Sequence, residues 1–242
     1  MTALDFIALF IFIGSWVGYT QFARIKAKTT PCLSRCLHQH RILWMRHIFD
    51  HDIRVSDAAM IANLDRHVAF FASSTMLVLA GVLTLFTQVD NVSAMLSAIP
   101  YATDKSPILI QIKLSLLVLI FVLAFFQFTW SMRQYGFVNI MMGAAPFAEK
   151  TQNKNLIDYA KQMAVVQDQA GHAYNYGLRS YYFALAALCW FYHPVLFIIS
   201  SLMVVYVLYY REFKSRALRA IKAGINNLEE DFSDLFPEVD IK

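Results

Sequence analysis

The side chains best suited to chemistry are gathered in residues 31–54. A helix turns about 100° per residue, and on such a helix most titratable side chains of this segment share one stripe. His47, Asp50 and His51 have the spacing i, i+3 and i+4, at which side chains can converge on one divalent metal ion. Imidazole and carboxylate ligands suit zinc, iron or manganese, so the pattern indicates a candidate metal site.

A second candidate metal site lies about two turns away on the same helix. Cys32, Cys36 and His40 are spaced four residues apart, and their thiolates would favour zinc or copper. The alternative is a helix face, turned to solvent or to another subunit, that is merely rich in histidine. No catalytic residue is assigned, because the sequence lacks a phosphate-binding glycine loop, a GxSxG elbow and an HExxH motif.

Polar and small residues also occur within the apolar segments. Lys113 is the clear ionisable residue in such a segment, a position that often marks function, although its amine is expected to reach the lipid headgroups. With Gln111 and Gln127 it could line a pore or polar seam, or these side chains could bond between helices. Gly14 and Gly18 form a GxxxG pattern, which permits close approach of a helix from the same or another subunit.

The composition predicts that these residues belong to a chain embedded in lipid. Of 242 residues, 58% are hydrophobic and 16% are charged, against about 25% charged in a typical soluble domain. The net charge of +4 is modest, so nucleic acid is not an expected partner. Three cysteines do not make a disulfide framework.

The predicted fold is all-α, a polytopic membrane protein with a single integral membrane domain and about five spans. The last two come from one apolar run, 180–210, which would be roughly 46 Å long as a single helix, against a hydrocarbon core about 30 Å thick. His193-Pro194 divides this run into a hairpin, whose short second arm could instead be re-entrant. The predicted spans are about 4–22, 68–87, 108–130, 174–192 and 195–210.

The distribution of basic residues predicts the orientation. Lys and Arg number eight in 23–66, one in 88–106, five in 131–179 and six in 211–242. Five spans place the three basic segments on one face, which the positive-inside rule makes cytoplasmic. We therefore expect a bacterial inner-membrane protein with its N-terminus outside and its C-terminus in the cytoplasm. Helical spacing predicts cytoplasmic helices over about 31–54, 155–173 and 211–230.

Several segments together resemble domain-of-unknown-function family 599, a group of bacterial and plant membrane proteins. The resemblance implies a multi-span helical protein and assigns no activity. It directs attention to five charged residues: Arg41, Arg54, Asp57, Arg133 and Arg179. The segments that carry it are Arg41–Met45, Arg54 with Asp57, Phe70–Thr75, Phe128–Tyr135, Gly177–Ala184 and Tyr210–Phe213.

The same charged residues have a physical interpretation. All five are expected at or below the cytoplasmic membrane boundary, where an Arg–Asp network could fix the loop helices to the ends of the spans. Repeated around an axis by several subunits, the arginines could instead form a selectivity girdle for anions.

Three functions remain open from the sequence. The first is a homo-oligomeric channel or transport-like protein, supported by the small residues of the first span and the absence of a soluble catalytic domain. The second is an accessory or scaffolding subunit of a larger membrane complex. The third is a metal-dependent membrane enzyme that uses the 32–54 helix.

Overall fold

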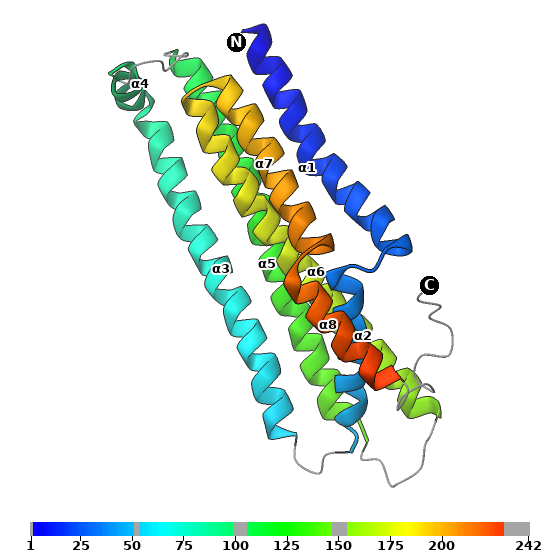
Figure 1. The fold of residues 1–242 in the computed structure, drawn as a ribbon. Helices are drawn as coiled ribbons and strands as arrows, with labels where there is room; N and C mark the ends of the chain where they lie inside the picture. The colour runs from blue at the N-terminus through cyan, green and yellow to red at the C-terminus, as the bar shows by residue number, and fades with distance from the viewer. Residues whose placement is uncertain (1, 51–53, 99–105, 147–153, 230–242) are drawn as a thin grey trace. The chain divides into compact units, whose positions relative to one another are not determined.

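The computed structural model describes residues 2–50, 54–98, 106–146 and 154–229, and these residues are helical without any strand. The predicted all-α fold is confirmed (Figure 1). The helices in chain order are α1 (Ala3–Thr29), α2 (Leu33–His47), α3 (Val55–Thr87), α4 (Val89–Ser97), α5 (Pro107–Ala144), α6 (Lys154–Leu188), the 3-10 helix η1 (Cys189–Phe191), α7 (Pro194–Phe213) and α8 (Arg216–Glu229).

In the part of the chain that the structure describes, four stretches of helix are long and apolar enough to cross a membrane, as in an integral membrane protein. The predicted span 174–192 lies mainly in α6 and η1 and does not reach the same apolarity, because Asn175, Arg179 and several tyrosines lie within it. The count of five spans therefore stays a prediction. The four candidate spans are Ala3–Ala27, Val55–Thr87, Pro107–Ala144 and Pro194–Asn226.

The predicted break at His193-Pro194 is present. The 3-10 helix η1 ends at Phe191, and α7 begins at Pro194, as expected for proline at the first position of a helix. The chain then returns along α6, because Ser200 Oγ of α7 donates a 3.3 Å hydrogen bond to the carbonyl oxygen of Ala186.

Helix α2 is shorter than the predicted helix over 31–54. It begins after Cys32 and ends at His47, because Ile48 and Phe49 turn into the protein interior and are almost fully buried. The carbonyl oxygen of Ile48 then accepts a 3.2 Å hydrogen bond from Arg54 Nε, which fixes the turn.

Two further predicted helices have different bounds in the structure. The helix predicted over 155–173 continues without interruption into the next apolar segment, so both belong to α6. The C-terminal helix does not continue from α7 but starts again at Arg216, because the Ser215 hydroxyl accepts the N–H of Leu218 at 3.1 Å and caps the new helix.

The chain divides into two compact units, and the five long helices contribute to both. Unit 1 comprises Met1–Arg24, Ala69–Thr129 and Tyr174–Leu208. Unit 2 comprises Ile25–Val68, Trp130–Ala173 and Tyr209–Lys242.

The interior of unit 1 is filled by aromatic rings. Phe12 of α1 lies 4.8 Å from Phe197 and 5.6 Å from Phe183, measured between ring centroids. Trp190 of η1 stacks on Phe197 at 5.1 Å. All four side chains are buried, and contacts of this kind add to the stabilisation from burial itself.

In unit 2, α8 lies beside α2, as Figure 1 also shows. Ile225 of α8 packs on Leu43 of α2, and both side chains are buried. Ile157 and Leu228 complete this apolar contact. This contact holds α2 against α8 and fixes the direction of the polar face of α2.

Candidate functional site

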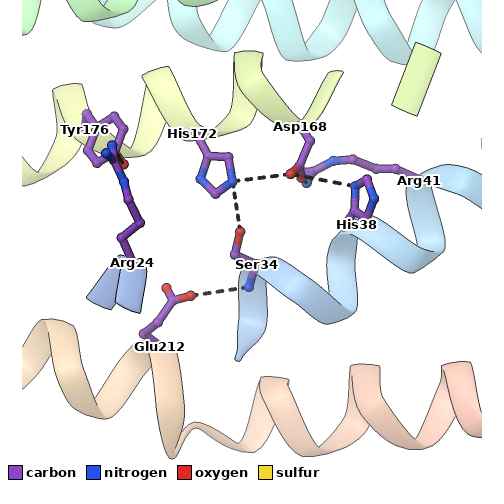
Figure 2. Close-up of polar contacts among 8 residues, drawn as sticks. All are labelled: Arg24, Ser34, His38, Arg41, Asp168, His172, Tyr176 and Glu212. Atoms are coloured by element: carbon purple, nitrogen blue, oxygen red, sulfur yellow. Dashed lines mark hydrogen bonds and ion pairs between the residues drawn. The ribbon is translucent and has the colours of Figure 1, made fainter. Parts of the chain in front are cut away.

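A polar cluster in unit 2 is centred on Asp168 of α6 (Figure 2). Arg41 of α2 forms an ion pair with Oδ1 of this carboxylate. His172 Nε2 lies 3.3 Å from Oδ2, and His38 Nδ1 lies 3.7 Å from the same oxygen. One carboxylate therefore meets three basic side chains, and with a side-chain exposure of 18% it is largely shielded from solvent.

Local helical spacing brings these side chains together in pairs. His38 and Arg41 are three residues apart on α2, and Asp168 and His172 are four apart on α6, so each pair shares one helix face. The two faces meet closely at Gly171. A Cβ there would lie 2.9 Å from Arg41 Nη2, so the glycine leaves room for the guanidinium.

The electrostatics of the cluster favour a charged Asp168. Burial alone would raise the pKa of its carboxyl group, but the hydrogen bond from His172 and the charge of Arg41 together hold that pKa below its ordinary value. Burial has the opposite effect on His38, whose pKa is lowered because the charged imidazolium is disfavoured away from water.

Ser34 and His172 resemble part of a catalytic triad but lack its geometry. Ser34 Oγ lies 3.3 Å from His172 Nε2, and Asp168 contacts the same nitrogen. In a triad the acid binds one imidazole nitrogen and the nucleophile binds the other, so that a proton can pass from the nucleophile to the imidazole while the acid orients the ring. This arrangement therefore does not activate Ser34 as a nucleophile.

The N-terminus of α2 is capped from a distant part of the chain. Glu212, near the end of α7, accepts the backbone N–H of Ser34 at 3.3 Å (Figure 2). A carboxylate is favourable there because the N-terminal N–H groups of a helix lack intrahelical partners and carry partial positive charge.

The structure shows where most residues of the two predicted metal sites lie. Among the residues that the structure describes, no three His, Cys, Asp or Glu side chains form a group that could hold a metal ion. Cys32, Cys36 and His40 do not form such a group among these residues, and the second site stays a prediction. Both thiols are buried, which raises the pKa of each, and His40 Nε2 lies 3.1 Å from the carbonyl oxygen of Ile221.

The other metal candidate falls partly outside the described residues, because His51 belongs to the segment 51–53. His47 is the last residue of α2 and is exposed. Asp50 lies beyond the helix and forms a 2.9 Å ion pair with Arg46. The helical spacing that motivated this site therefore ends at His47, and the site stays a prediction.

Arg54 binds the C-terminal end of α5 in unit 2. Its Nη1 donates to the carbonyl oxygens of Met142 at 3.0 Å and Ala145 at 2.6 Å, and its Nη2 donates to Pro146 at 2.7 Å. Met142 lies in the last turn of α5, where the helix dipole gives carbonyl oxygens partial negative charge, and Ala145 and Pro146 directly follow the helix. Arg54 thus binds the end of α5 through carbonyl groups and not through a carboxylate, and its predicted structural role stays a prediction.

Asp57 has a partner that sequence reasoning did not find. It is buried in the first turn of α3 and accepts a 2.7 Å hydrogen bond from Trp44 Nε1 of α2. This bond joins the two helices that flank residues 51–53.

The two remaining arginines lie against aromatic rings. Arg133 is exposed on α5, with its guanidinium 5.7 Å from the ring of Phe137. In unit 1, Arg179 lies 5.4 Å from the ring of Tyr19 and 5.5 Å from that of Tyr176. The hydroxyl of Tyr176 also accepts a 3.1 Å hydrogen bond from Arg24 (Figure 2).

Lys113 does not reach outward as expected. It is buried in unit 1, where Nζ donates a 2.9 Å hydrogen bond to the carbonyl oxygen of Trp190. The indole of Trp190 in turn donates to Asp5 at 2.9 Å. The amine stays inside because these polar partners replace the water that snorkelling would provide. Gln111 is exposed, and Gln127 is half-buried, so the three predicted seam residues differ in their surroundings.

The GxxxG residues Gly14 and Gly18 are exposed on α1. A Cβ at either position would have no described atom within 4 Å, so none of the other described helices approaches these two glycines closely.

A comparison with models of known protein families identifies the family of this chain. The profile of DUF599, described as "Protein of unknown function", matches residues 7–217. The chain belongs to the DUF599 family. No curated protein and no solved structure matches it. The match confirms the family suggested by the sequence segments and covers both units of this DUF599 protein.

Sequence reasoning missed Asp168 and His172 in this DUF599 protein. Their spacing of four residues was a signal, but it lay in a helix interpreted only as amphipathic. Asp5 was also missed, although an acid near the start of an apolar helix is unusual and needs a partner.

Proposed function

We propose that this DUF599 protein is a homo-oligomeric membrane protein of the channel or transport type, with α1 at the contact between copies. The observation that carries the proposal is the exposed face at Gly14 and Gly18, against which no described helix of the same chain packs. Small residues at this spacing let two helix backbones approach closely in lipid, where packing drives association.

A transport path between copies is more consistent with the protomer than a path through it. The interior of unit 1 is occupied by Phe12, Phe183, Phe197 and Trp190, which leaves an apolar and filled core. Gln111 and Ser115 are exposed on one face of α5 instead, in its largely apolar N-terminal half. Polar side chains on such a surface favour a second subunit or a water-filled path over lipid.

The first experiment measures the mass of the protein extracted gently from its own membrane, by native mass spectrometry. We expect one closed homo-oligomer. The variant Gly14→Leu/Gly18→Leu should be monomeric, because two leucines would separate the helices. Gly81→Leu is the matched control, since Gly81 is also exposed on a span with no described atom near its Cβ. A monomeric wild-type protein would contradict the proposal.

Transport is tested separately in liposomes. The assembled protein should carry an ion or small solute, and the monomeric variant should not. If the oligomer forms but carries none of the ions tested, the proposed assembly stands and the proposed transport function is wrong.

The alternative is an accessory or scaffolding subunit of a larger complex. The exposed face at Gly14 and Gly18 would fit a helix of another polypeptide equally well. The mass of a heteromeric complex would then identify that partner. In this case Arg41 and Asp57 substitutions should abolish assembly instead of flux, because these residues fix α2 to α6 and α3.

The orientation follows from the basic segments. We place the N-terminus outside a bacterial inner membrane and the C-terminus in the cytoplasm, in accordance with the positive-inside rule. A topology reporter fused at residue 242 should read cytoplasmic, and one inserted near residue 91 should read external.

A further inference from the structure

Two arginines of unit 1 contact the same tyrosine of α6. Arg24 Nη2 of α1 donates a 3.1 Å hydrogen bond to the hydroxyl of Tyr176 (Figure 2). The guanidinium of Arg179 lies 5.5 Å from the ring of Tyr176 and 5.4 Å from that of Tyr19. Tyr176 therefore brings two positive charges close to each other between α1 and α6.

These two charges are not balanced by an acid. Neither Arg24 nor Arg179 forms an ion pair with a carboxylate of the described residues. Asp168 of α6 pairs with Arg41, and Glu212 accepts the backbone N–H of Ser34, so these two acids already have other partners. Neighbouring like charges repel each other, and an anion bound between them would replace this repulsion with attraction.

Both guanidiniums are accessible to a ligand. Arg24 is exposed, and Arg179 is half-buried. Arg179 contacts its two tyrosines through their rings, and no described residue accepts a hydrogen bond from it. Its N–H donors, which lie in the plane of the guanidinium, therefore remain for an external acceptor.

The position of the two arginines indicates which anion they meet. Arg24 lies near the end of the apolar stretch Ala3–Ala27, and Arg179 belongs to the predicted span 174–192. Both are expected at the cytoplasmic membrane boundary, where anionic phospholipids present their phosphate groups. Guanidinium groups bind phosphate through paired hydrogen bonds, and basic pockets between membrane helices are typical sites for lipid headgroups.

We propose that Arg24 and Arg179 form a binding site for the phosphate group of an anionic phospholipid. Tyr176 holds the two guanidiniums beside each other, and the ring of Tyr19 supports Arg179 from within the protein. The site lies within one protomer, so it does not depend on the proposed assembly of several copies.

The test uses the full-length protein in detergent with added lipid. Native mass spectrometry counts the molecules of phosphatidylglycerol or phosphatidylcholine that stay bound. We expect preferential retention of phosphatidylglycerol by the wild-type protein. Its binding should be about fivefold weaker after Arg24→Gln, a change at an exposed position, and about thirtyfold weaker after Arg24→Gln/Arg179→Gln.

Two control variants separate this site from other charge effects. Arg66→Gln/Arg133→Gln removes the same number of charges from two exposed positions of unit 2 and should bind as the wild type does. The acids of the segment 229–240 have side chains outside the described residues. Glu229→Gln/Glu230→Gln/Asp231→Asn/Asp234→Asn neutralises most of them and should also leave binding unchanged.

Four results would overturn the proposal. Unchanged phosphatidylglycerol binding by Arg24→Gln and by the double glutamine variant, or an equal loss in Arg66→Gln/Arg133→Gln, would show that this pair does not form the site. Stronger binding by the variant of segment 229–240 would assign the two arginines to those acids. Release of the retained lipid by inorganic phosphate would assign the site to free phosphate instead of a lipid.

Discussion

Trp190 and Asp5 lie 185 positions apart in the chain, yet the indole Nε1 of Trp190 donates a 2.9 Å hydrogen bond to Oδ1 of Asp5. Both residues are buried. The other carboxylate oxygen of Asp5 accepts from the backbone N–H and the hydroxyl of Thr2, each at 2.8 Å. The backbone carbonyl of Trp190 accepts from Lys113. One tryptophan thus joins the starts of α1 and α5 to the turn between α6 and α7.

Removal of the indole donor should therefore destabilise unit 1. Trp190→Phe keeps an aromatic ring against Phe197 but leaves Asp5 Oδ1 without this donor. A buried polar group that loses its partner costs about 1–3 kcal/mol. We expect a lower midpoint of thermal unfolding in detergent. Trp130→Phe is the control, because Trp130 is half exposed, and its midpoint should not change.

Gly177 should not tolerate a methyl group. A Cβ at this position of α6 would overlap Cε1 of Phe128, a fully buried ring that cannot move freely. Gly177→Ala should lower the free energy of unfolding by about 1–3 kcal/mol through overpacking.

Gly136 provides the matched control for this substitution. It lies within α5, and a Cβ there would have no described atom within 4 Å. Gly136→Ala should leave stability unchanged or raise it by about 0.5–1 kcal/mol, because alanine loses less backbone entropy in a helix. Equal effects of the two alanine substitutions in thermal unfolding would contradict the packing at Gly177.

The interaction of Arg54 with the end of α5 should require a guanidinium. Arg54→Lys keeps the charge but cannot reach the carbonyls of Met142, Ala145 and Pro146 with two separate nitrogens. We expect a loss of about 1–3 kcal/mol. Faster hydrogen exchange in the last turns of α5 would accompany it. Arg66→Lys, at an exposed position, should change neither quantity.

Stability should fall on acidification in two steps, both set by the cluster around Asp168. The pKa of His38 is lower in the folded protein than its ordinary value of 6.5, because burial disfavours the charged ring. The unfolded chain therefore binds this proton first, and stability decreases as pH falls through 6.5 towards the folded pKa. The groups that face His38 are Asp168, Arg41 and His172.

Asp168 accounts for the second step. Although burial alone would raise it, the pKa of its carboxyl group lies below 3.8 in the folded protein, so its stabilising contribution is present above that pH and is lost below it. Unfolding midpoints measured from pH 8 to pH 3 check both steps. His38→Gln should remove the first step, and Asp168→Asn should remove the second. A wild-type protein whose midpoint is constant between pH 7 and pH 5 would contradict the role of His38.

The sequence was most informative where structure depends on near neighbours. The all-α class follows from long apolar segments with helical spacing, because each helical hydrogen bond joins residues only four positions apart. The break before α7 follows from Pro194, which fits the first turn of a helix but not its interior. The early end of α2 could not be predicted in this way, because burial of Ile48 and Phe49 and the bond from Arg54 decide it.

The sequence by itself determined that this chain is a helical DUF599 protein with apolar helices of membrane-spanning length, because composition, periodicity and family motifs are all local patterns. Only the tertiary structure decided which polar residues meet. Arg41 and Asp168 are 127 positions apart, and Trp190 and Asp5 are 185 apart. Their pairing depends on which helix faces pack together, and no spacing along the chain specifies that.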